Sequence, residues 1–141
     1  MRKMLIITTL MLACSVFVSA QSFVGKWKNI DDETGKPKAI IEIYKKESKY
    51  YGKIVELLMK PEHPTCVKCT DDRKDKPLIG LEMLRNMTLG GNELSGGKIL
   101  DPAKGKEYKC TISFENDDKL KVRGYIGISL VGRNQYWTRV K

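Results

Sequence analysis

The chain has 141 residues, a formal net charge of +9, and charged residues at 30% of its positions. This length suits one domain with a hydrophobic core of its own. The basic residues alternate with acidic ones and form no Arg-rich arm, so we do not expect a nucleic-acid partner. We interpret the excess charge as a solvated outer face, with weak attraction to anionic lipid headgroups or polysaccharide as the alternative.

Residues 1–20 have the features of a cleavable secretory signal. They contain a basic start, an apolar run up to Val18 that is too short for a permanent membrane span, and small residues before a cleavage point after Ala20. We therefore expect an exported protein, periplasmic or secreted, with one mature domain at residues 21–141. Lipidation at Cys14 is the alternative, which we disfavour because an apolar stretch would follow the anchor where a polar tether is usual. No second long apolar segment follows, so a membrane-spanning protein is not expected.

After the signal, apolar residues recur at every second position, which is typical of half-buried strands. The first three strands are expected at residues 23–28, 38–45 and 50–59. Turn residues separate them at 31–35 and 48–49. The period of 3.6 that would indicate helices is hard to find.

Residues 59–77 interrupt this pattern with prolines, cysteines and many charges. Long loops in compact domains are usually functional or covalently tied down. We interpret the acidic pair at 71–72 as turn-forming and hydrated. The next segment, 78–89, is ambiguous: it could be a strand lined by Ile79, Leu81, Met83 and Met87, or residues 81–85 could form a short helical turn.

The later strands are expected at 94–100, 108–114 and 120–126, followed by a final strand that ends near Val140. A glycine pair weakens the first of these and indicates a bulge. About eight strands in sequence order predict an all-β fold, a small up-and-down antiparallel barrel, because closure removes exposed strand edges.

The two ends of the predicted barrel match one another. In a closed meander the first and last strands are neighbours. Gly25 then allows close backbone approach, Trp27 covers one end, and Arg139, or else Arg133, lies over the indole as a cation–π partner. This pairing resembles the lipocalin signature. The alternative is that Trp27 is an ordinary core residue of another β-sandwich.

A series of short blocks in one order also resembles a known family, the exported bacterial family named domain of unknown function 2147. The resemblance covers nearly all of residues 22–140 and implies a single exported, lipocalin-like domain. It transfers no catalytic residue. The blocks are Gly25-Lys26-Trp27, Tyr51-Gly52-Lys53-Ile54-Val55, Cys66-Val67-Lys68-Cys69, Lys76-Pro77-Leu78-Ile79-Gly80-Leu81, Ile99-Leu100-Asp101-Pro102, Gly105-Lys106-Glu107-Tyr108, Val122-Arg123-Gly124-Tyr125-Ile126-Gly127, Gly132-Arg133 and Trp137-Thr138-Arg139.

Cysteines carry the strongest chemical signal of the chain. In an exported protein the spacing of Cys66 and Cys69 favours a disulfide between them, which leaves Cys110 as a buried free thiol. The alternatives are a bridge from either residue to Cys110, a zinc site with His63, and redox catalysis. A fourth zinc ligand and a helix N-terminus that would lower a thiol pKa are not evident. We expect no metal and no cofactor, and we interpret His63, the only histidine, as an exposed loop residue.

An eight-stranded barrel is either filled by side chains or just wide enough for one small ligand. The inward residues that we expect to line a ligand pocket are Phe23, Trp27, Ile41, Ile43, Ile54, Tyr108, Ile112, Phe114, Leu120, Val122 and Ile126.

These observations favour a binding module that holds a small apolar or amphipathic molecule. A filled barrel that contacts an envelope component is the alternative, and thiol or metal chemistry at the loop of Cys66 and Cys69 is a lesser one. The sequence leans against an enzyme, because it contains no nucleophile-elbow motif and no phosphate-binding loop. It gives neither the ligand nor the oligomeric state.

Overall fold

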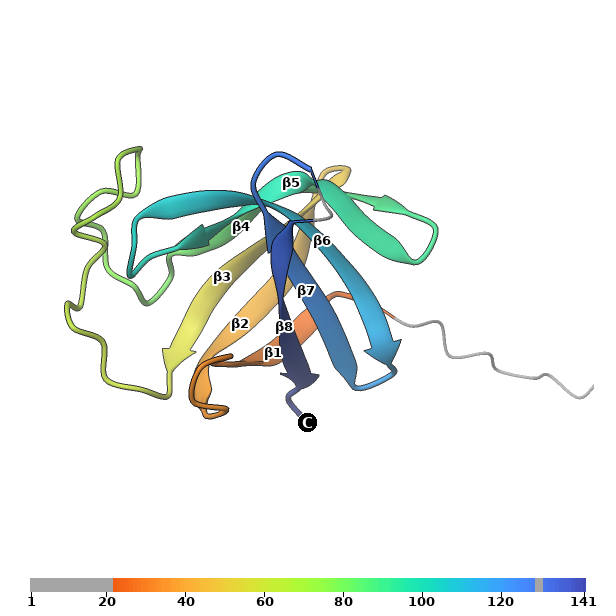
Figure 1. The fold of residues 1–141 in the computed structure, drawn as a ribbon, viewed down its shortest axis with the longest axis horizontal. Coiled ribbons are helices and arrows are strands. Elements are labelled where there is room, and N and C mark those ends of the chain that lie inside the picture. Colours follow the sequence, from red (N-terminus) through yellow and green to blue (C-terminus); the bar gives the residue numbers. More distant parts are fainter. Residues whose placement is uncertain (1–21, 129–130) are drawn as a thin grey trace, which may run out of the picture.

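The structure is a computed structural model that describes residues 22–128 and 131–141. Eight antiparallel strands follow one another in chain order and close into a barrel (Figure 1). This confirms the predicted up-and-down architecture. The strands are β1 (Gly25–Ile30), β2 (Pro37–Lys46), β3 (Lys49–Leu57), β4 (Glu82–Gly90), β5 (Glu93–Asp101), β6 (Lys106–Asn116), β7 (Lys119–Tyr125) and β8 (Gly132–Arg139).

The barrel closes where the two ends of the domain meet. β1 pairs with β2 on one side and with β8 on the other, and Trp27 stands opposite Arg139 in the second pairing. The predicted signal at residues 1–20, with Cys14, lies outside the described residues. Within the described part of the chain, no helix has the length and apolar character needed to cross a membrane.

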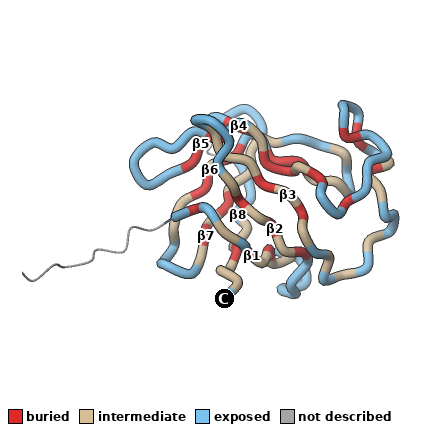
Figure 2. The backbone as a smooth tube through the Cα atoms, turned by 180° about the vertical axis from the view of Figure 1, so that it is seen from behind, coloured by how far each residue is buried: buried red, intermediate tan, exposed pale blue. Residues whose placement is uncertain are grey.

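Strand alternation builds one core. In β2, Ala39, Ile41 and Ile43 are buried, whereas the residues between them are only partly buried. β6 follows the same pattern with Cys110 and Ile112. Successive side chains of a strand point to opposite faces, so closure gathers the inward set into a single cluster. Figure 2 shows the buried positions along the strands.

The ambiguous segment 78–89 divides into a loop end and a strand. Residues 78–81 belong to the loop, where Leu78 is buried but Ile79 is exposed, so the expectation of Ile79 on an inner strand face is wrong. β4 begins at Glu82, and residues 81–85 form no helical turn. The ladder between β4 and β5 decides this outcome, because tertiary pairing overrides a local preference.

The glycine pair of β5 forms the expected bulge, with a register shift between Leu94 and Gly97. A Cβ on Gly97 would lie 2.0 Å from the carbonyl oxygen of Arg85 and 2.6 Å from Sδ of Met87. Only glycine therefore lets β4 and β5 come so close.

Trp27 fills one end of the barrel, called the closed end below. It is fully buried, and its Nε1 donates to the carbonyl oxygen of Phe23 at 2.8 Å. Cζ of Arg139 lies 4.2 Å from the indole ring centroid, within cation–π range. The guanidinium also donates to two backbone carbonyl oxygens, one in the N-terminal segment and one in the β6–β7 turn. Arg133, the alternative partner, lies elsewhere and pairs with Asp32.

Between β3 and β4 the chain leaves the barrel at residues 58–81, called the excursion below. It projects to one side of the barrel in Figure 1 and corresponds to the irregular loop expected at 59–77. A disulfide joins Cys66 to Cys69, and a β-bridge pairs Thr65 with Pro77. The excursion is therefore tied to itself at two places.

Candidate functional site

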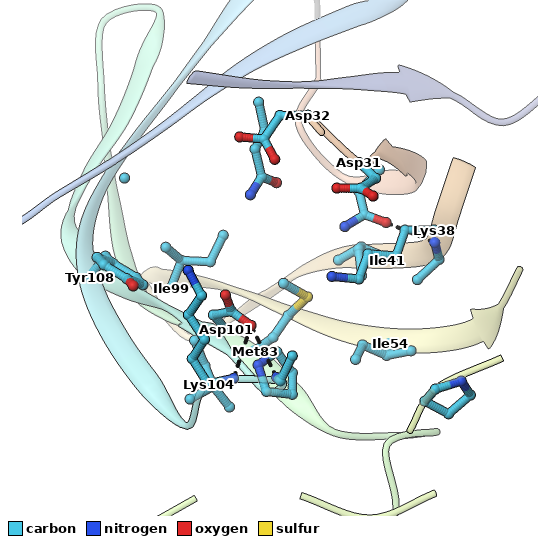
Figure 3. Close-up of a pocket in the computed structure, with 18 of the residues that line it drawn as sticks. Asp31, Asp32, Lys38, Ile41, Ile54, Met83, Ile99, Asp101, Lys104 and Tyr108 are labelled. Atoms are coloured by element: carbon cyan, nitrogen blue, oxygen red, sulfur yellow. Dashed lines mark hydrogen bonds between the residues drawn. The ribbon is translucent and has the colours of Figure 1, made fainter. Parts of the chain in front are cut away.

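A cavity of about 670 Å³ occupies the end of the barrel opposite Trp27. Its mouth is formed by the β1–β2 turn, the excursion, the β5–β6 turn and residues Ile126 and Val131 beside β7 and β8. In an up-and-down barrel alternate connections lie at one end, so these four segments share the mouth. Every strand contributes to its wall, which is mostly apolar. Ile41, Ile54, Met83 and Ile99 are seen in Figure 3, and Val122 of β7 also lines the cavity.

The residues expected to line a pocket divide between the two halves of the barrel. Ile41, Ile54, Tyr108 and Val122 line the cavity, and Ile126 lies exposed at its mouth. The other six do not border it and pack in or near the closed end: Phe23, Trp27, Ile43, Ile112, Phe114 and Leu120.

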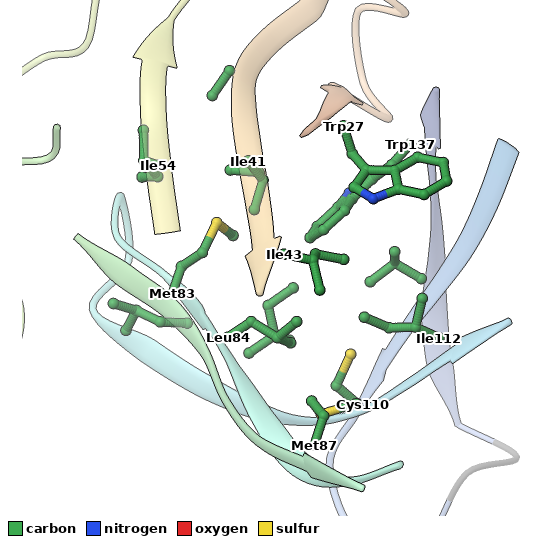
Figure 4. Close-up of a cluster of buried hydrophobic side chains, with 14 of the residues drawn as sticks. Trp27, Ile41, Ile43, Ile54, Met83, Leu84, Met87, Cys110, Ile112 and Trp137 are labelled. Carbon is green, nitrogen blue, oxygen red and sulfur yellow. The ribbon is translucent and has the colours of Figure 1, made fainter. Parts of the chain in front are cut away.

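Contacts between aromatic rings show how the closed half is filled. The ring centroids of Phe23 and Phe114 lie 4.4 Å apart, and Phe114 also meets Trp27 at 6.3 Å. Figure 4 shows Trp27 and Trp137 together with the aliphatic side chains of the buried cluster. Each strand runs the full height of the barrel, so some of its inward residues pack in the filled half and others line the open half. The two expected interiors, filled and hollow, are both present.

Sequence reasoning missed several residues of the cavity wall. Met83 lies in the segment that was ambiguous between strand and helical turn, and Ile99 faces inward because the bulge after Leu94 shifts the alternation of β5. Asn29 and Gln135 also line the cavity, but they are polar residues at inward positions of β1 and β8. No apolar pattern could mark these two.

Charged side chains surround the mouth. Lys38, Lys60, Lys68 and Lys104 border it together with acidic residues of the turns. The acids are engaged locally: Asp31 accepts from Oγ1 of Thr34 at 2.9 Å, which lowers the pKa of its carboxyl, and Asp101 accepts from the backbone N–H groups of residues 103 and 104. The mouth thus offers mixed charge around an apolar interior.

Arg73 fixes the excursion to the barrel. Its guanidinium is almost fully buried and contacts the carboxylates of Asp71 at 2.6 Å and Glu107 at 3.0 Å, and it donates to the carbonyl oxygen of Glu82 at 2.8 Å. Hydrogen bonds from Arg73 lower the pKa of Asp71 to about 2. A buried charge needs partners of this kind, because an unpaired one would cost several kcal/mol.

A second ion pair and a close backbone contact reinforce this attachment. Arg85 of β4 holds Asp72 with two hydrogen bonds of 2.9 Å. The acidic pair at 71–72 therefore does more than form a turn. A Cβ on Gly105 would lie 2.0 Å from the carbonyl oxygen of Lys68, so the excursion packs directly on the β5–β6 turn.

The cysteines lie apart from the cavity chemistry. Cys66 and Cys69 are bonded to each other and buried, so neither offers a thiolate to Cys110 or to a metal. Burial raises the pKa of the Cys110 thiol to about 12. His63 lies exposed at the mouth, 3.8 Å from Glu62. Among the residues that the structure describes, no three His, Cys, Asp or Glu side chains gather as a metal site requires.

A closed eight-stranded antiparallel barrel with one filled end and one open apolar end defines a lipocalin-like protein. The chain belongs to the bacterial family DUF2147, described as an uncharacterized protein conserved in bacteria, whose model matches residues 25–139.

A solved structure shows the same fold. It is described as protein HP1028 from the human pathogen Helicobacter pylori, which belongs to the lipocalin family. The two structures superpose with a TM-score of 0.75 at 15% identity, over 86% of this chain and 85% of that one. At this identity the likeness concerns the fold alone. No curated protein matches the chain.

Proposed function

We propose that this protein binds one small apolar or amphipathic molecule inside the barrel, without enzymatic chemistry. The observation that carries the proposal is the cavity of about 670 Å³, which lies within the range of known ligand sites, about 300–1,000 Å³. Its wall of aliphatic side chains suits a hydrocarbon or aromatic body, and the charged mouth suits a polar end that stays near water.

We further propose that the protein acts outside the cytoplasm. The disulfide between Cys66 and Cys69 supports this, because such bonds persist mainly in oxidising compartments. The signal-like residues 1–20 support it from the sequence.

A fluorescence titration tests the binding proposal. N-phenylnaphthylamine, a dye that brightens in apolar surroundings, should bind the native protein near one-to-one and be displaced by laurate. Purified protein stripped of bound lipid is used, so that no resident molecule masks the cavity. A stripped, folded protein that binds neither compound would contradict the proposal.

Gly124 provides a variant that fills the cavity. It lines the cavity in β7, and a Cβ there would meet Tyr108 and Ile99 only at ordinary contact distances of 3.6 and 3.8 Å. Gly124→Leu should therefore fold and abolish dye binding, because the added side chain enters the cavity. Gly90→Leu is the matched control: Gly90 is exposed in β4, and a Cβ there has open space around it. Equal dye binding by both variants would place the bound dye elsewhere on the protein.

A further inference from the structure

Two carboxamide side chains face the cavity with their oxygens already bonded. Oδ1 of Asn29 accepts the backbone N–H of Ala39 at 2.8 Å. Oε1 of Gln135 accepts the indole N–H of Trp137 at 3.2 Å. A backbone N–H and an indole N–H can only donate, so these bonds fix which end of each amide is oxygen. The amide nitrogens must then point away from those partners.

The two amide nitrogens have no hydrogen-bond partner in the part of the chain that the structure describes. Among the described residues, neither Nδ2 of Asn29 nor Nε2 of Gln135 meets an acceptor. No fully buried side-chain nitrogen or oxygen in that part of the chain lacks a bond, so both nitrogens keep some open surface. Asn29 is only 9% exposed and lines the cavity, as Gln135 does. The exposed surface of both amide nitrogens therefore faces the cavity.

Asn29 and Gln135 are also neighbours on the barrel wall. Asn29 stands opposite Trp137 in the β1–β8 ladder, and Gln135 lies two residues away from Trp137 on the same face of β8. Diagonal neighbours across such a ladder are about 7–8 Å apart, within reach of two amide side chains. One acceptor group can thus meet donors from both strands.

We propose that Asn29 and Gln135 form a donor site for an acceptor oxygen of the ligand, either a carboxylate or a carbonyl group. This inference rests on the proposed binding function and adds the chemistry of the ligand's polar end. Both amide nitrogens offer open N–H donors, whereas both amide oxygens already accept a hydrogen bond, so the site favours an acceptor over an ammonium group. A pure hydrocarbon would displace water from these donors without replacing its hydrogen bonds, which disfavours it.

Exchange of each amide for a carboxylate tests the site with little change of shape. In Asn29→Asp and Gln135→Glu an oxygen remains to accept from Ala39 or Trp137, while the donor becomes an anionic oxygen. Asn116→Asp is the matched control. Oδ1 of Asn116 accepts the backbone N–H of Asp118 at 3.0 Å in the exposed β6–β7 turn, far from the mouth. It undergoes the same chemical change and the same change in net charge.

Three ligands of equal chain length separate the possible results, each measured by displacement of N-phenylnaphthylamine, which carries no acceptor oxygen. Asn29→Asp should weaken laurate binding about tenfold or more, because a bond to a charged group is lost and repulsion replaces it. Binding of methyl laurate to this variant should be weakened less than binding of laurate. Dodecylammonium should bind the variant as tightly as the wild type or more tightly. Asn116→Asp should bind all three as the wild type does. A loss confined to laurate would identify the carboxylate, and a loss shared with the ester would identify the carbonyl.

Failure of this inference is distinguishable from failure of the proposed function. If the dye binds but Asn29→Asp and Gln135→Glu change no displacement more than Asn116→Asp does, the donor site is wrong and the cavity still binds. If the variants bind all three ligands more weakly by the same factor, the substitutions act on the fold and the donor site is again wrong. If the dye does not bind the wild type, both proposals fail. Thermal unfolding checks that each variant is folded, and Gln135→Glu carries the test if Asn29→Asp is not.

Discussion

Trp27 and Arg139 act together at the closed end. The indole fills the space between strands, and the guanidinium lies over it while bonding the backbone of two other segments. This arrangement was predictable from the sequence, because β1 and β8 must pair in a closed meander and both residues lie in those strands. The topology left Arg133 as an alternative to Arg139, and the register of the β1–β8 ladder decides between them.

Trp27→Ala should therefore destabilise the barrel by about 3–5 kcal/mol, the usual cost of removing a large buried aromatic side chain. Urea unfolding followed by circular dichroism measures the free energy of unfolding. Arg139→Gln should cost less, because it leaves the core packing in place. A Trp27→Ala protein that unfolds at the wild-type urea concentration would contradict the role given to this residue.

Cys110 should make stability fall at high pH. Burial raises its pKa from 9.0 to about 12, so the folded protein keeps the thiol proton while the unfolded chain loses it. Between pH 9 and 12 unfolding releases a proton, and the free energy of unfolding decreases as pH rises. The measurement is the difference in free energy of unfolding between wild type and Cys110→Ala, so that the contributions of all other groups cancel. A difference that does not change with pH would contradict this assignment.

Other residues of the site could not be predicted from the sequence. Asn29 and Gln135 interrupt the apolar alternation, and a polar residue in a strand is ordinarily taken to face outward. Asn29 lies two residues after Trp27 on the same face of β1, and it is accommodated inside because its Oδ1 accepts the N–H of Ala39. That hydrogen bond depends on the pairing of β1 with β2, which one strand's sequence does not contain.

At the scale of elements, buried charge holds the excursion to the barrel, whereas its disulfide ties the excursion only to itself. Its length and its tie at Cys66 and Cys69 followed from the sequence, because prolines and a short cysteine spacing are local signals. The burial of Arg73 did not, because Glu107, one of its partners, lies on β6 more than thirty positions away. Attachment of a loop through such distant contacts requires the folded structure.

Arg73→Met should release part of the excursion while the barrel stays folded. Loss of the guanidinium leaves Asp71 and Glu107 without their buried partner, so trypsin should cut after nearby lysines. Limited proteolysis with mass spectrometry locates the cuts at neutral pH. Arg123→Met, which changes an arginine on the outer wall of β7, is the control. If both variants resist trypsin as the wild type does, Arg73 does not hold the excursion.

The same attachment should weaken in acid. The pKa of Asp71 is lowered to about 2 by hydrogen bonds from Arg73, so the carboxylate stabilises the folded state above pH 4. This contribution is lost as the pH falls through 2. Cleavage of the excursion by pepsin should rise from pH 4 to pH 2 in the wild type. The Asp71→Asn variant should be cut equally at pH 4 and at pH 2. A wild type that shows no such rise would contradict the prediction.

At the scale of the whole molecule, the sequence was sufficient for the barrel but not for its hollow. Eight strands with short turns leave few other closed arrangements, so the architecture followed from alternation and turn residues. Whether an inward side chain borders the cavity depends on its height along the barrel axis, as the contrast between Ile41 and Ile43 shows. Height is set by stagger between strands, which alternation does not report.

Export with cleavage after Ala20 remains a prediction at this scale. The intact mass of protein recovered from outside the cytoplasm should match a chain that begins at Gln21. The apolar run and the small residues before Gln21 are the reason. A lipid-bearing chain that begins at Cys14 would contradict it.

The even number of strands has a practical consequence. Phe23 precedes β1 and accepts from the indole of Trp27, and Val140 follows β8 and donates to the carbonyl oxygen of Lys26, so both ends of the domain lie at the closed end. A tag or a sensor-surface linkage attached at either end of the domain would therefore leave through the base and present the mouth to solution. The protein could thus be immobilised with the cavity facing the solution. The four segments at the mouth could then be exchanged to alter ligand selectivity while the closed end is left unchanged.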